Sequence, residues 1–121
     1  MTQNKATNPS VIYHICRRED WDAGVSGGLY RAPEPDRADG FLHFSTAGQI
    51  VESAARHRAG QSGLVLIEVD CAKLGNELRW ETSRGGALFP HLYGPILLTA
   101  VTAVHDLPLG PDGRHLFPAF T

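Results

Sequence analysis

The side chains best suited to chemistry are spread along the chain rather than gathered in one motif. They comprise three histidines, a serine, a glutamate and a tyrosine: His14, His43, Ser45, Glu81, His91 and Tyr93. The sequence has no G-x-S-x-G, P-loop, dinucleotide-binding glycine pattern or H-E-x-x-H, which argues against most hydrolase and kinase classes. Imidazole, hydroxyl and aromatic groups together favour a metal-free pocket that binds a sugar or nucleotide by hydrogen bonds and stacking.

The same residue types leave two other kinds of site open. Three histidines and a glutamate form a donor set that zinc accepts, although no two of them have the i, i+4 spacing of a helical pair. A nucleophilic pair of Cys16 and His14 is a further alternative, but one strand face would hold these residues about 7 Å apart. We therefore expect no metal, and keep a zinc-dependent hydrolase as an alternative.

Two of the candidates fall within residues 40–46 (GFLHFST), which are typical of a short strand that runs into a helix. Alternation along the strand points Phe41, His43 and Ser45 to one face. Polar side chains at a strand end, beside the free N–H groups of a helix, suit an anion or a ribose. The competing interpretation is that His43 is a hydrogen-bonded core histidine and that the hydroxyls only cap the helix.

The helix expected next has signals at both ends. Thr46, with Gln49 three residues later, fits a capping box. An apolar stripe follows, basic residues occupy 56–58 and Gly60 is the expected stop. Thr46 therefore joins the candidate pocket as a hydroxyl at the helix start.

Composition limits the class of protein. The 121 residues are 42% apolar and 20% charged, which is ordinary for one globular domain. The N-terminus has no signal-peptide core and no apolar run approaches a membrane span, so we expect a cytoplasmic protein without membrane contact. Cys16 and Cys71 fit buried positions rather than a disulfide framework. A net charge of −2 without a basic cluster argues against nucleic acid as a bulk ligand.

The remaining patterns predict an α+β fold with five or six short strands and two helices. Besides the central stretch, short strands are expected over 11–16, 29–31, 64–69 and 78–81, and the longest β-like run covers 96–104. The apolar run 64–69 predicts a strand covered on both faces. An early helix is expected over 17–25. The elements do not alternate as βαβ units, so a doubly wound sheet is not expected.

Three segments are predicted to lack regular structure. Residues 1–10 read as a disordered lead-in and 32–39 as an exposed loop. Residues 89–95 contain two prolines and are too proline-bound for a central strand, so they are expected to form an aromatic wall or a pocket rim. Residues 105–121 are expected to be a tail that Leu116, Phe117 and Phe120 pack onto the surface.

Three segments carry a resemblance to a known family: IYHI at 12–15, GFLHFST at 40–46 and HLYGPI at 91–96. Over about 11–108 the chain resembles the uncharacterised family called domain of unknown function 952. The resemblance implies one ADP-ribosyltransferase-like domain over 11–121, with a split, mostly antiparallel sheet that grips NAD in a cleft. This fold is related to that of the RNA 2′-phosphotransferases.

The resemblance also implies roles for the candidate residues. His14 would contact the ribose next to the nicotinamide, and His43 and Ser45 would line the pocket as in the RNA 2′-phosphotransferases. Glu81 would orient the ribose, by its order along the chain. His91 and Tyr93 belong to the family's own third motif and join the pocket.

The resemblance therefore implies an NAD-dependent transferase that moves ADP-ribose or acts on a phosphorylated nucleic-acid end. Its expected partner is a small-molecule nucleotide. The catalytic candidates are His14, His43 and Glu81, and the ligand-binding candidates are His14, His43, Ser45, Thr46, His91 and Tyr93. The alternative is a non-catalytic module that binds a nucleotide or a protein.

Overall fold

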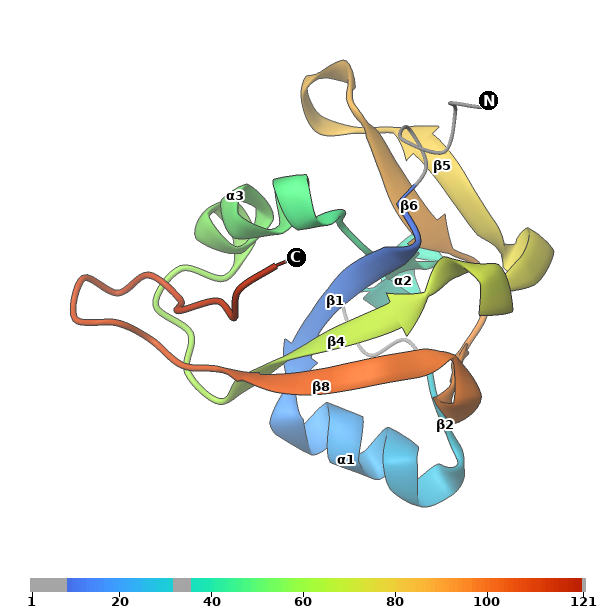
Figure 1. Cartoon of the computed structure of the whole chain (residues 1–121), viewed down its shortest axis with the longest axis horizontal. Coiled ribbons are helices and arrows are strands. Elements are labelled where there is room, and N and C mark those ends of the chain that lie inside the picture. The colour runs from blue at the N-terminus through green and yellow to red at the C-terminus, as the bar shows by residue number, and fades with distance from the viewer. Residues whose placement is uncertain (1–8, 32–35, 121) are drawn as a thin grey trace.

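The computed structural model describes residues 9–31 and 36–120, and in this part of the chain all strands pair antiparallel in three small sheets (Figure 1). The first sheet has the order β1-β4-β8 and consists of β1 (Val11–Arg17), β4 (Leu64–Asp70) and β8 (Val101–Leu107). The second pairs β2 (Leu29–Tyr30) with β7 (Ile96–Leu97). The third has the order β3-β6-β5 and consists of β3 (Leu42–His43), β6 (Leu88–Leu92) and β5 (Leu78–Thr82). This arrangement confirms the predicted α+β class with mostly antiparallel strands.

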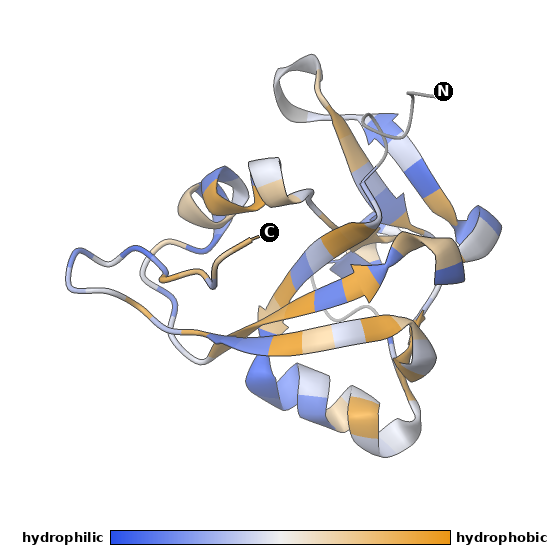
Figure 2. Ribbon diagram, viewed as in Figure 1, coloured by the Kyte–Doolittle hydropathy of each residue, from blue (hydrophilic) through white to orange (hydrophobic). Residues whose placement is uncertain are grey.

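Helices cover the two faces of the first sheet. The described helices are α1 (Arg18–Gly27), α2 (Asp36–Asp39) and α3 (Ala47–His57), with 3₁₀ turns at Cys71–Lys73, Gly75–Glu77, Arg84–Gly86 and Leu98–Ala100. Figure 1 shows α1 along one face of β1-β4-β8 and α3 with the C-terminal tail on the opposite side. Hydrophobic residues concentrate in the strands of this sheet, whereas the first turn of α1 is hydrophilic (Figure 2).

Alternation along β1 and β4 divides the core into two clusters. On the side of α1, Ile12, Cys16 and Ile67 pack with Trp21. On the side of α3, strand residues including Ile15 pack with helix residues such as Ile50. Strand β4 is therefore buried on both faces, as its apolar run predicted, and Cys16 is a buried free cysteine.

The predicted start of α3 is confirmed. Thr46 is the N-cap, the capping box with Gln49 is present, and the backbone N–H of Thr46 donates to Oε1 of Gln49 at 3.0 Å. The predicted stop at Gly60 is late, because the helix ends at His57 with Arg58 as its C-cap. Gly60 follows in the left-handed region, with a φ of 76°.

The prediction that residues 89–95 could not form a central strand is wrong. β6 lies between β3 and β5, and Pro90 is fully buried in it. The carbonyl of Pro90 accepts the N–H of Phe44 at 3.0 Å. In a strand the N–H of a residue points to the same side as its carbonyl, so the N–H that Pro90 lacks would point to Phe44, just beyond the end of β3. One ladder bond is missing and the pairing with β5 is intact.

Two more expectations need correction. Within the predicted loop 32–39, residues Asp36–Asp39 form a helical turn, and the rest of the loop lies outside the described residues, as does most of the lead-in 1–10. The predicted strand 96–104 is divided by a 3₁₀ turn, because β7 pairs with β2 whereas β8 pairs with β4. In the tail, Phe117 and Phe120 pack on the core as expected, but Leu116 is 54% exposed.

Gly24 lets α1 approach β2 closely, which gives a test of the packing. A Cβ at this position would lie 2.9 Å from Cα of Tyr30, whereas a Cβ at Gly27 in the same helix meets nothing within 4 Å. We expect Gly24→Ala to lower the free energy of unfolding by about 1 kcal/mol or more, since overpacking outweighs the helix propensity of alanine. Urea denaturation should show Gly27→Ala as neutral or stabilised, by about 0.5–1 kcal/mol. Equal effects of both substitutions would contradict this packing.

Candidate functional site

A cavity of about 790 Å³ lies where β1, α2, β3, α3 and the β5–β6 hairpin meet. Four of the predicted site residues line it: His14, His43, Ser45 and His91. The backbones of Tyr13 and Ser45 form a bridge, with N–H···O distances of 2.8 and 2.9 Å, so β1 runs beside the end of β3. His14 and His43 therefore both face this cavity, although β1 and β3 belong to different sheets.

His14 is buried and both of its ring nitrogens have protein partners. Nδ1 lies 2.7 Å from the carbonyl oxygen of His43, which can only accept, so Nδ1 carries the proton. Nε2 accepts the hydroxyl of Tyr30 at 3.0 Å. Burial lowers the pKa of His14, which keeps the ring neutral. For His14 to touch a ribose, as the sequence predicted, one of these bonds must break.

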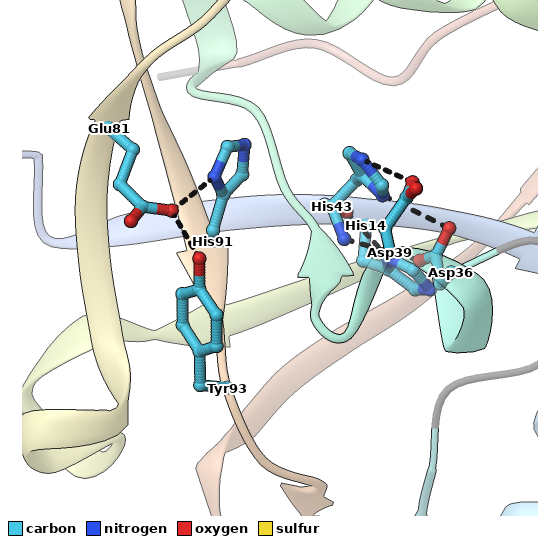
Figure 3. A network of polar contacts seen from close by, with 7 residues as sticks. All are labelled: His14, Asp36, Asp39, His43, Glu81, His91 and Tyr93. Atoms are coloured by element: carbon cyan, nitrogen blue, oxygen red, sulfur yellow. Dashed lines mark hydrogen bonds and ion pairs between the residues drawn. The ribbon is translucent and has the colours of Figure 1, made fainter.

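His43 is held between two carboxylates of α2 (Figure 3). Its Nδ1 lies 3.1 Å from Oδ1 of Asp36, its Nε2 lies 3.3 Å from Oδ2 of Asp39, and its backbone N–H donates to Asp36 at 3.2 Å. The hydrogen bond to Asp36 is the main cause that raises the pKa of His43. Burial is the largest single effect on the pKa of Asp36 and would raise it, but the hydrogen bonds and charge of His43, together with the neighbouring His14, outweigh burial and lower the pKa. The geometry therefore favours an imidazolium between two carboxylates.

The two hydroxyls of the central stretch have different positions. Ser45 is buried, lines the cavity and donates to Oγ of Ser53 at 3.1 Å. Thr46 does not line the cavity, because its side chain serves the capping box of α3. Its predicted place in the pocket is therefore wrong, whereas its helix-capping role is confirmed.

Glu81, His91 and Tyr93 form a second polar group on the face of β5 and β6 (Figure 3). Oε1 of Glu81 accepts Nδ1–H of His91 at 2.8 Å and the hydroxyl of Tyr93 at 2.7 Å. The hydrogen bond from Tyr93, followed by the one from His91, lowers the pKa of Glu81. The hydrogen bond between Tyr93 and Glu81 also raises the pKa of Tyr93. Of the three, His91 lines the cavity, so Glu81 reaches it only through this histidine.

Phe41 joins the two polar groups. Its ring is 4.7 Å from that of His43 and is stacked on that of His91, with centroids 4.1 Å apart and an interplanar angle of 26°. On its other side, Phe41 and Tyr93 line a smaller hollow of about 190 Å³. The alternation predicted for Phe41 and His43 thus places an aromatic ring against both histidines, whose own rings are 5.6 Å apart.

Three charged lining residues were missed by the sequence analysis: Asp36, Asp39 and Arg58. The aspartates occurred in a presumed loop, where charge is ordinarily solvated, and no spacing marked them. Arg58 did have a signal, since this C-cap residue follows the buried Ile50 and Ala54 of α3 at intervals of four.

The fold and the cavity define an α+β protein in which three antiparallel sheets surround a histidine-lined site. The chain belongs to the family described as protein of unknown function (DUF952), which matches residues 15–104. This confirms the family that the sequence motifs indicated.

Solved structures of one bacterial protein are similar. The crystal structure of protein CC0527 from Caulobacter crescentus is 46% identical with a TM-score of 0.84, and the match covers 88% of this chain and 93% of that chain. The solution NMR structure of CC0527 is 46% identical with a TM-score of 0.78, covering 88% and 91%. A comparison with curated proteins gave no match. No helix among the described residues has the length and apolar character to span a membrane.

The position of His43 between two carboxylates predicts how stability depends on pH. Its pKa is raised in the folded protein, so above its ordinary value of 6.5 the folded state holds a proton that the unfolded chain loses. We expect the free energy of unfolding to fall as the pH rises from 6.5 through the raised pKa of His43. Below 6.5 the lowered pKa of His14 acts oppositely, so the test belongs above this value.

Urea denaturation at a series of pH values measures this slope. His43→Gln should flatten it, because the glutamine does not titrate. Arg56→Gln, on the exposed side of α3, removes no group that titrates in this range and serves as the control that keeps the slope. A slope unchanged in His43→Gln would show that the proton is held elsewhere.

Proposed function

We propose that this protein is an NAD-dependent transferase with an ADP-ribosyltransferase-like fold, and that NAD binds in the 790 Å³ cavity. The volume falls within the range of about 300–1,000 Å³ that is usual for small-molecule sites. Split antiparallel sheets border the cavity, as expected for this fold. The single observation that carries the proposal is the distribution of charge in the cavity lining.

Arg58 supplies the positive end of that distribution. The side chain is half-buried and donates to the carbonyl of Ile15 at 3.2 Å and to Oε1 of Gln61 at 3.3 Å, both of which are neutral. Among residues 9–31 and 36–120, no carboxylate forms an ion pair with it. A guanidinium held in place without a counter-ion is a ready partner for a phosphate.

Asp36 and Asp39 supply the negative end. They come from α2, whereas Arg58 ends α3, and two carboxylates face the single imidazolium of His43. NAD has the matching distribution, with a cationic nicotinamide ring at one end and an anionic diphosphate in the middle. The residues present therefore fit NAD: Arg58 would hold the diphosphate and the α2 carboxylates would face the charged ring.

The chemistry that NAD supplies when bound is a ribosyl carbon attached to a good leaving group. The contribution of this chain is to hold and orient. Its buried His14 fixes the backbone of His43, and Phe41 and Phe89 offer aromatic surface next to the cavity. The small-molecule partner is thus a nucleotide, and transfer of ADP-ribose is the reaction class.

Calorimetric titration with NAD and an assay for released nicotinamide test this proposal. We expect saturable binding and turnover by the wild type, and Arg58→Gln should weaken binding by about tenfold to a hundredfold, because a bond to a charged group is lost. Arg56→Gln is the matched control, since Arg56 pairs with Glu52 on the exposed side of α3. Arg58→Lys keeps the charge and separates charge from folding effects.

No binding by the wild type would refute the proposal. Binding without nicotinamide release would leave the non-catalytic nucleotide module, the alternative that the sequence kept open.

The negative end is tested by comparing two ligands. Asp39→Asn removes a charge from an aspartate that is 52% exposed, so folding should be little affected. We expect its affinity for NAD to fall several-fold, whereas its affinity for ADP-ribose, which lacks the cationic ring, should stay the same or rise. Equal losses for both ligands would place the nicotinamide elsewhere.

A further inference from the structure

We propose that His91 and Glu81 form a general-base dyad that removes the proton from a hydroxyl nucleophile, either water or an alcohol, at the cavity. The identity of the group donor rests on the proposed function, whereas the dyad itself rests on geometry. Nδ1 of His91 is 2.8 Å from Oε1 of Glu81. A carboxylate only accepts, so the proton is on Nδ1 and the lone pair of the neutral ring is on Nε2.

Nε2 of His91 is the ring nitrogen that the bond to Glu81 leaves open. No protein partner within hydrogen-bond distance of this atom occurs in the described residues, and none of the buried side-chain nitrogens or oxygens there lacks a partner. Nε2 must therefore be accessible, although the side chain is only 8% exposed. Since His91 lines the cavity, its free lone pair faces the space where a ligand would bind.

The other two histidines of the predicted site cannot act in this way without rearrangement. His14 has both nitrogens bonded to Tyr30 and to the carbonyl of His43. His43 has both nitrogens next to carboxylates and is favoured as an imidazolium, which has no lone pair to accept a proton. Of these three, His91 is the one with an open acceptor.

The dyad is held rigidly, as a base must be. Glu81 and His91 lie on paired strands and on one face, because Arg79 is opposite His91 and Glu81 is two residues further along β5. Phe41 stacks on the imidazole at 4.1 Å. Tyr93 donates to the same Oε1 at 2.7 Å, and its ring lies 5.0 Å from the guanidinium carbon of Arg79. Tyr93 is therefore a positioning residue that orients Glu81.

Nε2 takes the proton from the O–H group of the acceptor while the oxygen forms a bond to the electrophilic carbon of the donor. The bond from that carbon to the leaving group breaks, and the leaving group departs with the electron pair. With NAD as donor the departing nicotinamide is neutral, so the proton passes from His91 to solvent. Glu81 stabilises the imidazolium that exists in between.

Two measurements on the free protein test the dyad without any donor. Nitrogen-15 NMR of the imidazoles should find His91 in the Nδ1–H form, and Glu81→Gln should populate the Nε2–H form.

Diethyl pyrocarbonate should acylate His91 faster than it acylates the fully bonded His14, and Glu81→Gln should slow the reaction at His91. Glu52→Gln, which changes an exposed helix carboxylate, is the control that should leave both results unchanged. An Nε2–H tautomer in the wild type, or an unreactive His91, would overturn the proposal.

Turnover provides the third measurement where the wild type releases nicotinamide from NAD. His91→Gln should then lower kcat by about 10²- to 10⁴-fold, the usual contribution of a general base. Tyr93→Phe should lower kcat less and leave KM unchanged. A His91→Gln variant with wild-type kcat would overturn the dyad even if NAD binds. Conversely, the wild type could show no NAD binding and still have the predicted tautomer and reactivity of His91. That result would refute NAD as the group donor and support the dyad.

Discussion

The two hydrogen bonds of His14 are the interaction on which the rest of the structure depends. This residue belongs to β1 of the first sheet, it donates to the carbonyl of His43 in the third sheet, and it accepts from Tyr30 in the second. One buried imidazole thus connects all three sheets. Loss of either bond would leave a buried polar group unsatisfied, at a cost of about 1–3 kcal/mol. The neutral state that burial imposes on His14 is also what allows Nε2 to accept from Tyr30.

The site follows from this connection. The carbonyl of His43 is tied to β1, while its backbone N–H and its imidazole are held by the carboxylates of α2. The ring of Phe41 contacts both His43 and His91, which also contact each other edge to face. The result is a cavity whose three strand histidines have different protonation patterns: a buried neutral ring, an imidazolium between carboxylates and a ring oriented by Glu81. Three identical side chains acquire different chemistry from their partners alone.

Local signals predicted much of the fold. The capping box at Thr46 and the apolar run of β4 act within a few residues, so they can be recognised in the sequence alone. The alternation in 40–46 likewise placed Phe41, His43 and Ser45 on one face, and the family motifs indicated which histidines share the site.

The features that sequence reasoning missed depend on tertiary contacts. Pro90 fits a central strand only because β3 ends beside it, and the run 96–104 is divided only because β7 and β8 join different sheets. Asp36 is buried because His43 neutralises it, which no spacing in the sequence could reveal. The link from Glu81 to the cavity through His91 similarly depends on the register of β5 and β6.

The order β1-β4-β8 has a consequence for how the chain assembles. Its central strand β4 is joined to β1 and to β8 by long connections, whereas the β5–β6 hairpin closes locally. Closing long loops costs chain entropy before any pairing rewards it, so the hairpin can form early and the central sheet late. During synthesis on the ribosome, β4 keeps one edge open until β8 has emerged. The apolar residues of β4 are then exposed to other chains, which makes this interval the period of greatest aggregation risk.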